Sequence, residues 1–369
     1  KYTVNYDRLN RMIEQVITEQ DSVRRFWPSS PCNGELDFGD AWHDDSKGDM
    51  HFWDVWHSGK SFNAYLDVNP RFCSEFGFQS WPSFAEVKQF VPEQDWNITS
   101  LTFEQHQKNP RGNSIITEMF TRYFRFPSGF ESMLYLSQVQ QAIAIKTACD
   151  HWRAISPVCR GMLYWQLNDN WPVSSWSSLE YSGRWKQLHY HAKRFFAPQY
   201  LVFSEHTGKL SLHLLNDAKE PASVNALLKW VDWQGEEKQC WSLEQTVIAD
   251  SNTILWQLDE SIEKDELTSG FLYVEAQIGE DRISNTWFST HELKTLPIAK
   301  ANIDVSIEGS QITLVADKPA FFVHLESDVD GRFGDSSFTL LTNVPMTVEY
   351  LGDDVLGMQQ SLRVYHLND

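Results

Sequence analysis

Apolar residues near the start of the chain recur at the spacing of an amphipathic helix. Leu9, Met12, Ile13, Val16 and Ile17 follow the i, i+3, i+4, i+7, i+8 pattern, which places them in one stripe along a helix. Further helices are predicted for three segments: SFAEVKQFV (83–91), roughly 137–153, and LEYSGRWKQLHYHAKRFF (179–196).

Short apolar runs lie between these helical segments, and about four strands are expected up to residue 200. The clearest are MHFWDVWH from residue 50, FCSEFGF from residue 72 and GMLYWQLND from residue 161. Strands that alternate with helices indicate parallel β/α units. A closed (β/α)₈ barrel needs eight strands and about 250 residues. Residues 1–198 therefore fit the C-terminal half of a (β/α)₈ TIM barrel.

The pattern changes after Pro198, where apolar and polar residues alternate in segments separated by turns. LVFSEHTGKLSLHLLNDA, ASVNALLKWVDW and GFLYVEAQIG are examples, and such segments are typical of antiparallel β-sandwiches. A second alternating region begins near Lys300, after the linker TLPIAKA (295–301). We therefore expect two immunoglobulin-like β-sandwich modules, over 199–296 and 297–369.

Composition narrows the possible functions. The 369 residues are 41% hydrophobic, enough for a proper core, and carry a formal net charge of −19. A nucleic-acid or anionic-membrane partner would require a basic face, so neither is expected. No apolar run approaches the roughly 20 residues that span a bilayer. The five cysteines are scattered without a CxxC pair, so neither a disulfide framework nor a zinc site is indicated.

Tryptophan is unusually frequent, with 16 residues, of which 11 precede residue 200. An indole combines a flat apolar face with an N–H donor, which suits stacking on a sugar ring while bonding its hydroxyls. A polyol ligand is therefore plausible for the first 200 residues. In the sandwich modules the alternating positions favour core packing over a carbohydrate platform for four tryptophans: Trp230, Trp233, Trp241 and Trp256.

A single carboxylate, Glu75, stands within the aromatic stretch RFCSEFGFQSWPS (71–83). Burying a charge costs several kcal/mol unless it is paired or hydrogen-bonded, so Glu75 is either a core residue bonded to an arginine or backbone amide, or a functional acid. It comes late in its predicted strand, and Trp165, Gln166 and Asn168 occupy the corresponding place in the next one. Catalytic residues of β/α barrels gather at these strand ends.

The motifs SPCNG, GDMHFWDVWH, RFCSEFGFQSWPSF and GMLYWQLNDNWPVSSWSSLEYSGRWKQLHYHAKRFFAP resemble the C-terminal portion of β-mannosidases. This group belongs to the family of retaining glycosidases that also includes β-galactosidases and β-glucuronidases. The resemblance covers essentially the whole chain. It implies a retaining exo-β-mannosidase that removes terminal β-linked mannose from oligosaccharides by double displacement, without a metal or cofactor.

The resemblance also implies residue roles. Glu75 corresponds to the nucleophile and Trp165 to the tryptophan that forms the floor of the sugar site. Trp53, Trp56 and His57 are expected to line the pocket, and Asn168 to contribute to substrate binding; these lie at the ends of their predicted strands.

The stretch AWHDDSKGDMHFWDVWH (41–57) suggests a metal site as an alternative, because it contains seven potential ligands: His43, Asp44, Asp45, Asp49, His51, Asp54 and His57. Its spacing matches neither a zinc helix nor a calcium loop, and the resembling family needs no metal. We expect instead a solvated acidic loop that leads to the sugar site.

Retaining catalysis needs a second carboxyl group as acid and base. In the resembling family this group is the Glu of an Asn-Glu pair, and no such pair occurs in this chain. We therefore expect the acid/base to lie in a missing N-terminal part of the same polypeptide, and the chain alone to be inactive. Two alternatives remain: a non-catalytic carbohydrate-binding fragment and another β-glycosidase of the same family.

Overall fold

The computed structural model describes residues 4–34, 42–259, 262 and 264–367. Three short strands form a parallel sheet in the order β1-β2-β3 (Met50–Phe52, Cys73–Phe76 and Met162–Tyr164). The predicted strand runs from residues 50, 72 and 161 are confirmed, but the expected number of about four is wrong for the described residues. Besides these three, the described residues before β4 (Gln199–Ser204) contain no further strand.

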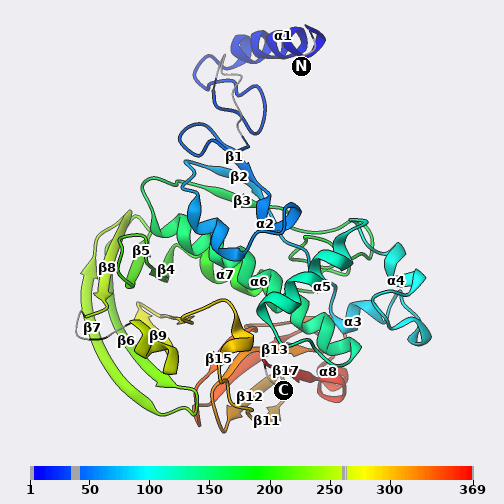
Figure 1. Cartoon of the computed structure of the whole chain (residues 1–369), viewed down its shortest axis with the longest axis vertical. Coiled ribbons are helices and arrows are strands. Elements are labelled where there is room, and N and C mark those ends of the chain that lie inside the picture. Colours follow the sequence, from blue (N-terminus) through cyan, green and yellow to red (C-terminus); the bar gives the residue numbers. More distant parts are fainter. Residues whose placement is uncertain (1–3, 35–41, 260–261, 263, 368–369) are drawn as a thin grey trace.

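Helices connect and cover this sheet (Figure 1). They are α1 (Val4–Gln20), α2 (Asp54–His57), η1 (Phe62–Asp67), α3 (Phe84–Val87), η2 (Glu93–Asp95), α4 (Leu101–Gln105), α5 (Gly112–Tyr123), α6 (Phe130–Ala154) and α7 (Gln187–Phe195). The predicted helix over 137–153 is the central part of α6, whose buried face runs most of its length. α5 was not predicted.

Two predicted helices are shorter than expected. The segment 83–91 forms only the single turn α3, which is buried on all sides and followed by turns up to Pro92. The segment 179–196 is helical only from Gln187 onward. Before it, Gly183 adopts a positive φ of 87° in a turn where Glu180 N donates to Arg184 O. A backbone turn of this kind cannot continue into a helix.

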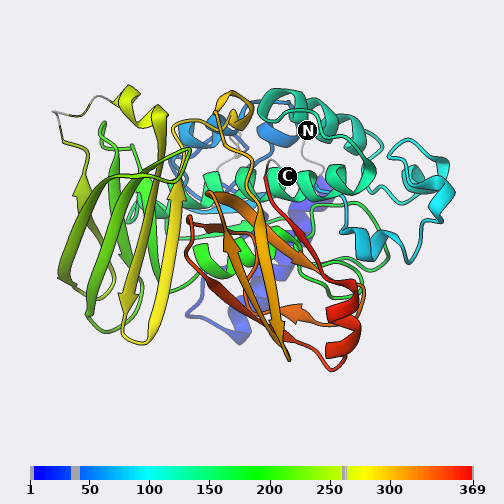
Figure 2. The same ribbon diagram turned by 90° about the horizontal axis from the view of Figure 1, so that it is seen from below.

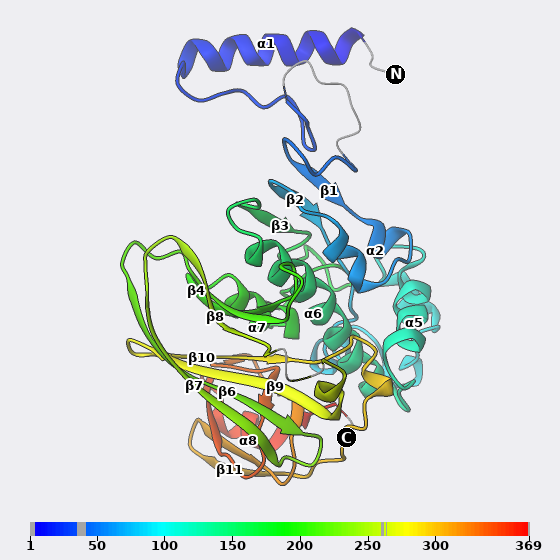
Figure 3. The same cartoon turned by 60° about the vertical axis from the view of Figure 1, so that its left-hand side comes forward.

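α1 confirms the helix that the N-terminal pattern predicts, but its apolar stripe does not pack into the core. Leu9, Met12, Ile13, Val16 and Ile17 are all exposed. In Figures 1 and 3 the helix lies apart from the rest of the chain, joined to it by a loop. The stripe therefore contributes no burial to the part of the fold described here. No described helix has the length and apolarity that a membrane span requires.

The first β-sandwich consists of two antiparallel sheets, β4-β5-β8 and β10-β9-β6-β7. The strands are β4 (Gln199–Ser204), β5 (Ser211–Asn216), β6 (Ala222–Asp232), β7 (Glu237–Val247), β8 (Ser251–Gln257), β9 (Gly270–Ile278) and β10 (Asp281–Trp287), with η3 (Lys264–Ser269) before β9. Burial alternates along β6, as its sequence predicts. Leu212, Leu228 and Val274 from the two sheets share one core.

The tryptophans of this sandwich pack as the alternation predicts. Trp233 and Trp256 are buried. Trp230 and Trp241 are partly buried and pack against the core that the two sheets share. The prediction of core packing is therefore confirmed.

The C-terminal sandwich has the sheets β11-β12-β16-β14 and β15-β13-β17. Its elements are β11 (Ile303–Glu308), β12 (Gln311–Ala316), β13 (Ala320–Glu326), β14 (Arg332–Phe333), β15 (Phe338–Leu340), β16 (Met346–Leu351), α8 (Val355–Ser361) and β17 (Arg363–Tyr365); η4 (Leu293–Thr295) precedes them. Figure 2 shows the two sandwiches side by side, with the helices of the α/β part packed against them. The core of the α/β part extends into both, since Tyr200, Phe271 and Phe321 belong to it.

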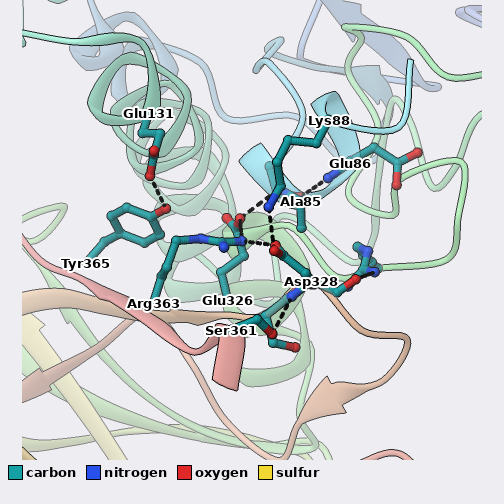
Figure 4. Close-up of polar contacts among 12 residues, drawn as sticks. Ala85, Glu86, Lys88, Glu131, Glu326, Asp328, Ser361, Arg363 and Tyr365 are labelled. Carbon is teal, nitrogen blue, oxygen red and sulfur yellow. Dashed lines mark hydrogen bonds and ion pairs between the residues drawn. The ribbon is translucent and has the colours of Figure 1, made fainter. Parts of the chain in front are cut away.

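Buried charges join the C-terminal sandwich to α3 (Figure 4). Glu326 on β13 accepts hydrogen bonds from the Ala85 amide and from Arg363 Nη2, both at 2.8 Å. Arg363 also donates to Asp328 at 2.6 Å, and Asp328 pairs with Lys88 at 2.5 Å. Burial raises the pKa of Glu326, whereas the Arg363 guanidinium acts against that rise. The charged form of Glu326 is therefore stable in this buried position only because Arg363 lies beside it.

Replacing Arg363 with Ala is expected to destabilise the protein by about 3 kcal/mol, because it leaves Glu326 buried without its cationic partner. Chemical denaturation of the variant measures the change in free energy of unfolding. Lys238→Ala is the matched control, since Lys238 pairs with Asp232 and Glu236 on the surface, where an ion pair contributes little to stability. Equal losses in the two variants would contradict the role assigned to the Glu326–Arg363 pair.

Candidate active site

Glu75 lies on the central strand of the parallel sheet, in register with His51 on β1. Its side chain is 30% exposed. The indole Nε1 of Trp53 donates a hydrogen bond of 2.9 Å to Glu75 Oε1. The partner is neither the arginine nor the backbone amide expected of a core glutamate. Glu75 is therefore a partly open carboxylate with one oxygen fixed by an indole.

His51 stands beside this carboxylate, with Nδ1 3.8 Å from Glu75 Oε2. That separation is too long for a hydrogen bond. Burial lowers the pKa of His51, while the nearby charges of Glu75 and Asp49 act in the opposite direction. His51 is thus a neutral neighbour of Glu75 at pH 7, and its other nitrogen, Nε2, lies 3.2 Å from Ser30 Oγ.

Asp49 is buried directly behind His51 and is held by four donors. Trp27 Nε1 donates at 2.8 Å, Ser30 Oγ at 2.6 Å and the Cys32 amide at 2.9 Å, and Ser74 Oγ donates as well. Burial favours the neutral acid, but the four hydrogen bonds outweigh it and lower the pKa of Asp49. Asp49 is therefore a structural anion that ties the 27–32 segment to β2.

The prediction that this stretch forms a solvated loop is consequently wrong for Asp49 and His51, because both side chains are buried. Asp54 is half-buried and pairs with Lys60 at 2.6 Å. Within the described ranges, no three His, Cys, Asp or Glu side chains are arranged to hold a metal ion. The five cysteines are all free thiols.

A glycine allows the aromatic residues to close around Glu75. A Cβ on Gly77 would lie 2.9 Å from the Trp53 ring and would also collide with the Trp165 carbonyl oxygen. The Trp165 amide donates to Phe76 O at 2.7 Å. Gly77 therefore permits Trp53 and the backbone of Trp165 to approach the end of β2, next to Glu75.

Trp165 is 46% exposed, which leaves it accessible to a ligand, and its role as a sugar platform stays a prediction. Trp53 is largely buried and packs edge-on to Trp176 with centroids 6.2 Å apart. It contacts His57, whose ring centroid lies 5.2 Å away. His57 is exposed, and burial, followed by the charge of Arg111, lowers its pKa.

Trp56 has no exposed surface. Its ring packs against Phe78 and Trp176 at 5.1 and 5.8 Å between centroids. A side chain enclosed in this way cannot touch a ligand, so the expectation that Trp56 lines the pocket is corrected: it supports the residues behind the site. The reason is that α2 begins directly after Trp53 and turns Trp56 toward the core.

Asn168 is exposed on the loop that follows β3. Its carbonyl oxygen accepts a hydrogen bond of 2.7 Å from Gln166 Nε2. The structure places it on the same loop as Trp165, and no hydrogen bond joins it to Glu75 among the described residues.

The loop 165–178 is anchored by a buried carboxylate, Asp169, that no motif in the sequence singles out. The side chain of Asp169 is only 1% exposed and pairs with Lys108 at 2.5 Å. It also accepts hydrogen bonds from Ser175 Oγ at 2.5 Å and Gln166 Nε2 at 3.1 Å. Lys108 thus compensates the buried charge of Asp169. The same ion pair connects the loop that carries Trp165 to the segment before α5.

Gln141 on α6 connects this loop to the one after β2. Its Nε2 donates to Phe78 O at 2.9 Å and to Trp176 O and Ser177 O at 3.2 Å, and its Oε1 accepts from Ser80 Oγ at 2.8 Å. Asp169 and Gln141 were not predicted as site residues, and Asp49 and His51 were considered only as potential metal ligands. A polar side chain on a buried helix face is the only signal by which Gln141 could have been found.

These features define what the site can do chemically. A partly exposed carboxylate with one oxygen fixed, a neutral histidine next to it and an open indole face nearby suit nucleophilic attack on a polyol held against the indole.

Comparisons with known proteins show which families and folds the chain resembles. Residues 208–295 match the model of a family described as "Mannosidase Ig/CBM-like domain", and residues 296–369 match one described as "Ig-fold domain" of the Ig_mannosidase family. The β-mannosidase of Capra hircus is 32% identical over 372 residues, covering 91% of this chain and 42% of that protein. The β-mannosidase of Rattus norvegicus is 30% identical over 363 residues, covering 90% and 41%.

Among solved structures, the β-D-mannosidase of Dictyoglomus thermophilum is similar with a TM-score of 0.83 and 27% identity, covering 97% of this chain and 44% of that one. The exo-chitosanase of Amycolatopsis orientalis has a TM-score of 0.63 at 13% identity, covering 82% and 42%, and shares the fold. The predicted resemblance to the C-terminal portion of β-mannosidases is confirmed, as is a multidomain α/β plus β fold. The chain spans about two fifths of the length of the curated relatives it matches.

Asp169→Asn is expected to destabilise the protein by about 3 kcal/mol and to loosen residues 165–178, because Lys108 loses its buried counter-charge. Hydrogen exchange measured by mass spectrometry should show faster exchange in peptides from this loop. Asp250→Asn is the control, since Asp250 pairs with Arg160 on the surface. If exchange in the loop were the same in both variants, Asp169 would not be its anchor.

Proposed function

We propose that this chain is the nucleophile-carrying portion of a retaining exo-β-mannosidase, which hydrolyses terminal non-reducing β-D-mannose residues by double displacement. The observation that carries the proposal is the hydrogen bond from Trp53 to Glu75 on β2, next to the exposed Trp165, which directly follows the neighbouring strand β3. The similarity to β-mannosidases over about nine tenths of the chain supports it. The substrates would be β-mannoside oligosaccharides.

In the first step, one Glu75 oxygen forms a bond to the anomeric carbon while the bond from that carbon to the leaving oxygen breaks. A second carboxyl group donates its proton to the leaving oxygen. In the second step the resulting carboxylate takes a proton from water, the water oxygen bonds to the anomeric carbon, and the ester to Glu75 breaks. Mannose leaves, and Glu75 is again a carboxylate.

The chain's own residues supply the nucleophile and its surroundings. Trp53 Nε1 fixes Glu75 Oε1 and leaves Oε2 for attack. Neutral His51 adds no positive charge that would weaken the nucleophile. Trp165 offers the face against which the sugar ring stacks, and His57 and Asn168 lie at the exposed rim.

The second carboxyl group would come from residues upstream of this chain, because the Asn-Glu pair of the resembling family is absent here. The same upstream part would complete the barrel. The sheet order β1-β2-β3 leaves β1 and β3 as edge strands, and a half-barrel needs strands to pair with both edges. We propose a domain division into the half-barrel 1–198 and the sandwich modules 199–296 and 297–369.

Glu75→Gln in the complete protein is expected to lower kcat by at least about 10³-fold with little change in substrate affinity. Gln keeps the hydrogen bond from Trp53 and the shape of the side chain, but it cannot form the glycosyl ester. Steady-state kinetics on a chromogenic β-mannoside measure the change. Glu118→Gln on the exposed face of α5 is the control. A Glu75→Gln protein that retains most of its kcat would rule Glu75 out as nucleophile.

The isolated 369-residue chain is expected to show no turnover of a chromogenic β-mannoside, because it lacks the acid/base and half of the barrel. The assay compares the chain alone with the chain mixed with the upstream segment. Turnover by the chain alone that Glu75→Gln abolishes would show that the acid/base lies within these residues. Sugar binding without turnover in the complete protein would favour the carbohydrate-binding alternative, and faster turnover of another β-glycoside would favour a different glycosidase.

A further inference from the structure

A cavity of about 570 Å³ lies where the α/β part meets both sandwiches. Its walls come from η1, α6 and α7, from β4 and β10 of the first sandwich with the segment that follows, and from β15 of the second. Figure 3 shows α6, α7, β4 and β10 gathered in this region. None of the candidate active-site residues lines it. Its volume falls in the range of roughly 300–1,000 Å³ that small-molecule sites occupy.

The charged groups that line the cavity are neutralised by partners of opposite charge. Lys146 pairs with Asp150 one helical turn away, and Asp150 also accepts a hydrogen bond of 2.7 Å from Tyr200. Lys264 pairs with Glu205 at 2.6 Å. Arg194 pairs with Asp335 at 2.6 Å and donates to the carbonyl oxygens of the same loop. These pairs leave little charge to attract an ion.

The histidines of the cavity are uncharged at neutral pH. Burial is the main cause that lowers the pKa of His151 to about 4, and neighbouring His206 acts in the same direction. Burial, followed by the charge of Lys146, lowers the pKa of His291 to about 4. Burial is also the main cause that lowers the pKa values of His206 and His191. A neutral imidazole provides one hydrogen-bond donor and one acceptor. His291 uses both, toward Thr147 and Asn63, so a ligand would bind to the other histidines.

An aromatic face and hydroxyl groups complete the lining. Trp287 at the end of β10 is half-buried: it packs against the core of the first sandwich and also lines the cavity. Ser289 and Thr290 follow it along the wall, and Thr286 and Thr339 share a hydrogen bond of 2.8 Å across the junction of the two sandwiches. A flat indole beside uncharged donors and acceptors matches the alternating apolar and hydroxyl faces of a sugar.

We propose that this cavity is a second saccharide site, which binds a neutral sugar of one or two residues independently of Glu75. Because the walls come from all three parts of the chain, a bound sugar bridges them and stabilises their packing. The proposal does not rest on the proposed function, since the two sites share no residue.

Isothermal titration of the 369-residue chain with D-mannose and with β-1,4-mannobiose tests it. Ser289→Trp places an indole in the cavity and is expected to weaken binding at least about tenfold. Ser242→Trp, on the exposed face of β7, is the matched control and should leave the affinity unchanged. Trp287→Phe keeps an aromatic ring but removes the N–H donor, and should weaken binding several-fold without endangering the fold. Trp165→Ala reports on the candidate active site.

Weaker sugar binding in Ser289→Trp and, to a smaller extent, in Trp287→Phe, with the affinity unchanged in Ser242→Trp and in Trp165→Ala, is the expected result. Binding that only Trp165→Ala removes would overturn the inference and leave the proposed function intact. Absence of sugar binding by the unmodified chain would overturn it as well. So would phosphate binding that Ser289→Trp abolishes, because the cavity would then be an anion site.

Discussion

The hydrogen bond from the Trp53 indole to Glu75 is the interaction on which the candidate site depends. It fixes one carboxylate oxygen while 30% of the side chain stays open. The indole can reach that position only because Gly77 has no side chain to block it. Trp53 is in turn held by Trp176, which packs against both Trp53 and the enclosed Trp56. A small number of aromatic contacts thus determines where the nucleophilic oxygen lies.

Buried polar groups keep the surrounding loops in place. Asp49, Asp169 and Gln141 each connect segments that are distant in sequence, and each has its hydrogen-bonding capacity largely met. Glu326 and Arg363 do the same between the C-terminal sandwich and α3. Such groups add little net stability over apolar packing, but removing one partner is costly. They therefore fix relative positions more than they strengthen the fold.

Periodicity in the sequence predicted the elements whose burial follows a simple pattern. The central part of α6, the alternating strand β6 and the three strands of the parallel sheet were expected from it. It failed where a turn interrupts an apolar pattern, as at Gly183 before α7. α5 was missed because its apolar stripe is short and its start carries no capping side chain.

For the site, the sequence singled out Glu75, Trp53 and Trp165, which the structure brings together at the end of β2. The resemblance to a known family contributed to this selection, because the pattern alone left a core glutamate equally acceptable. Trp56 was wrongly predicted to line the pocket, because the sequence of the short helix α2 does not indicate which of its side chains point toward the core. Asp169 and Gln141 were missed because their roles depend on contacts between distant loops, which no local pattern reports.

The central claim, that Glu75 is the nucleophile of a retaining glycosidase, is tested most directly by covalent labelling of the complete protein. A 2-deoxy-2-fluoro-β-mannosyl fluoride forms the glycosyl ester but slows its hydrolysis, so the ester accumulates. Peptide mass spectrometry should then place one fluoromannosyl group on Glu75. A label on a different carboxylate, or no label when the sugar demonstrably binds, would contradict the claim.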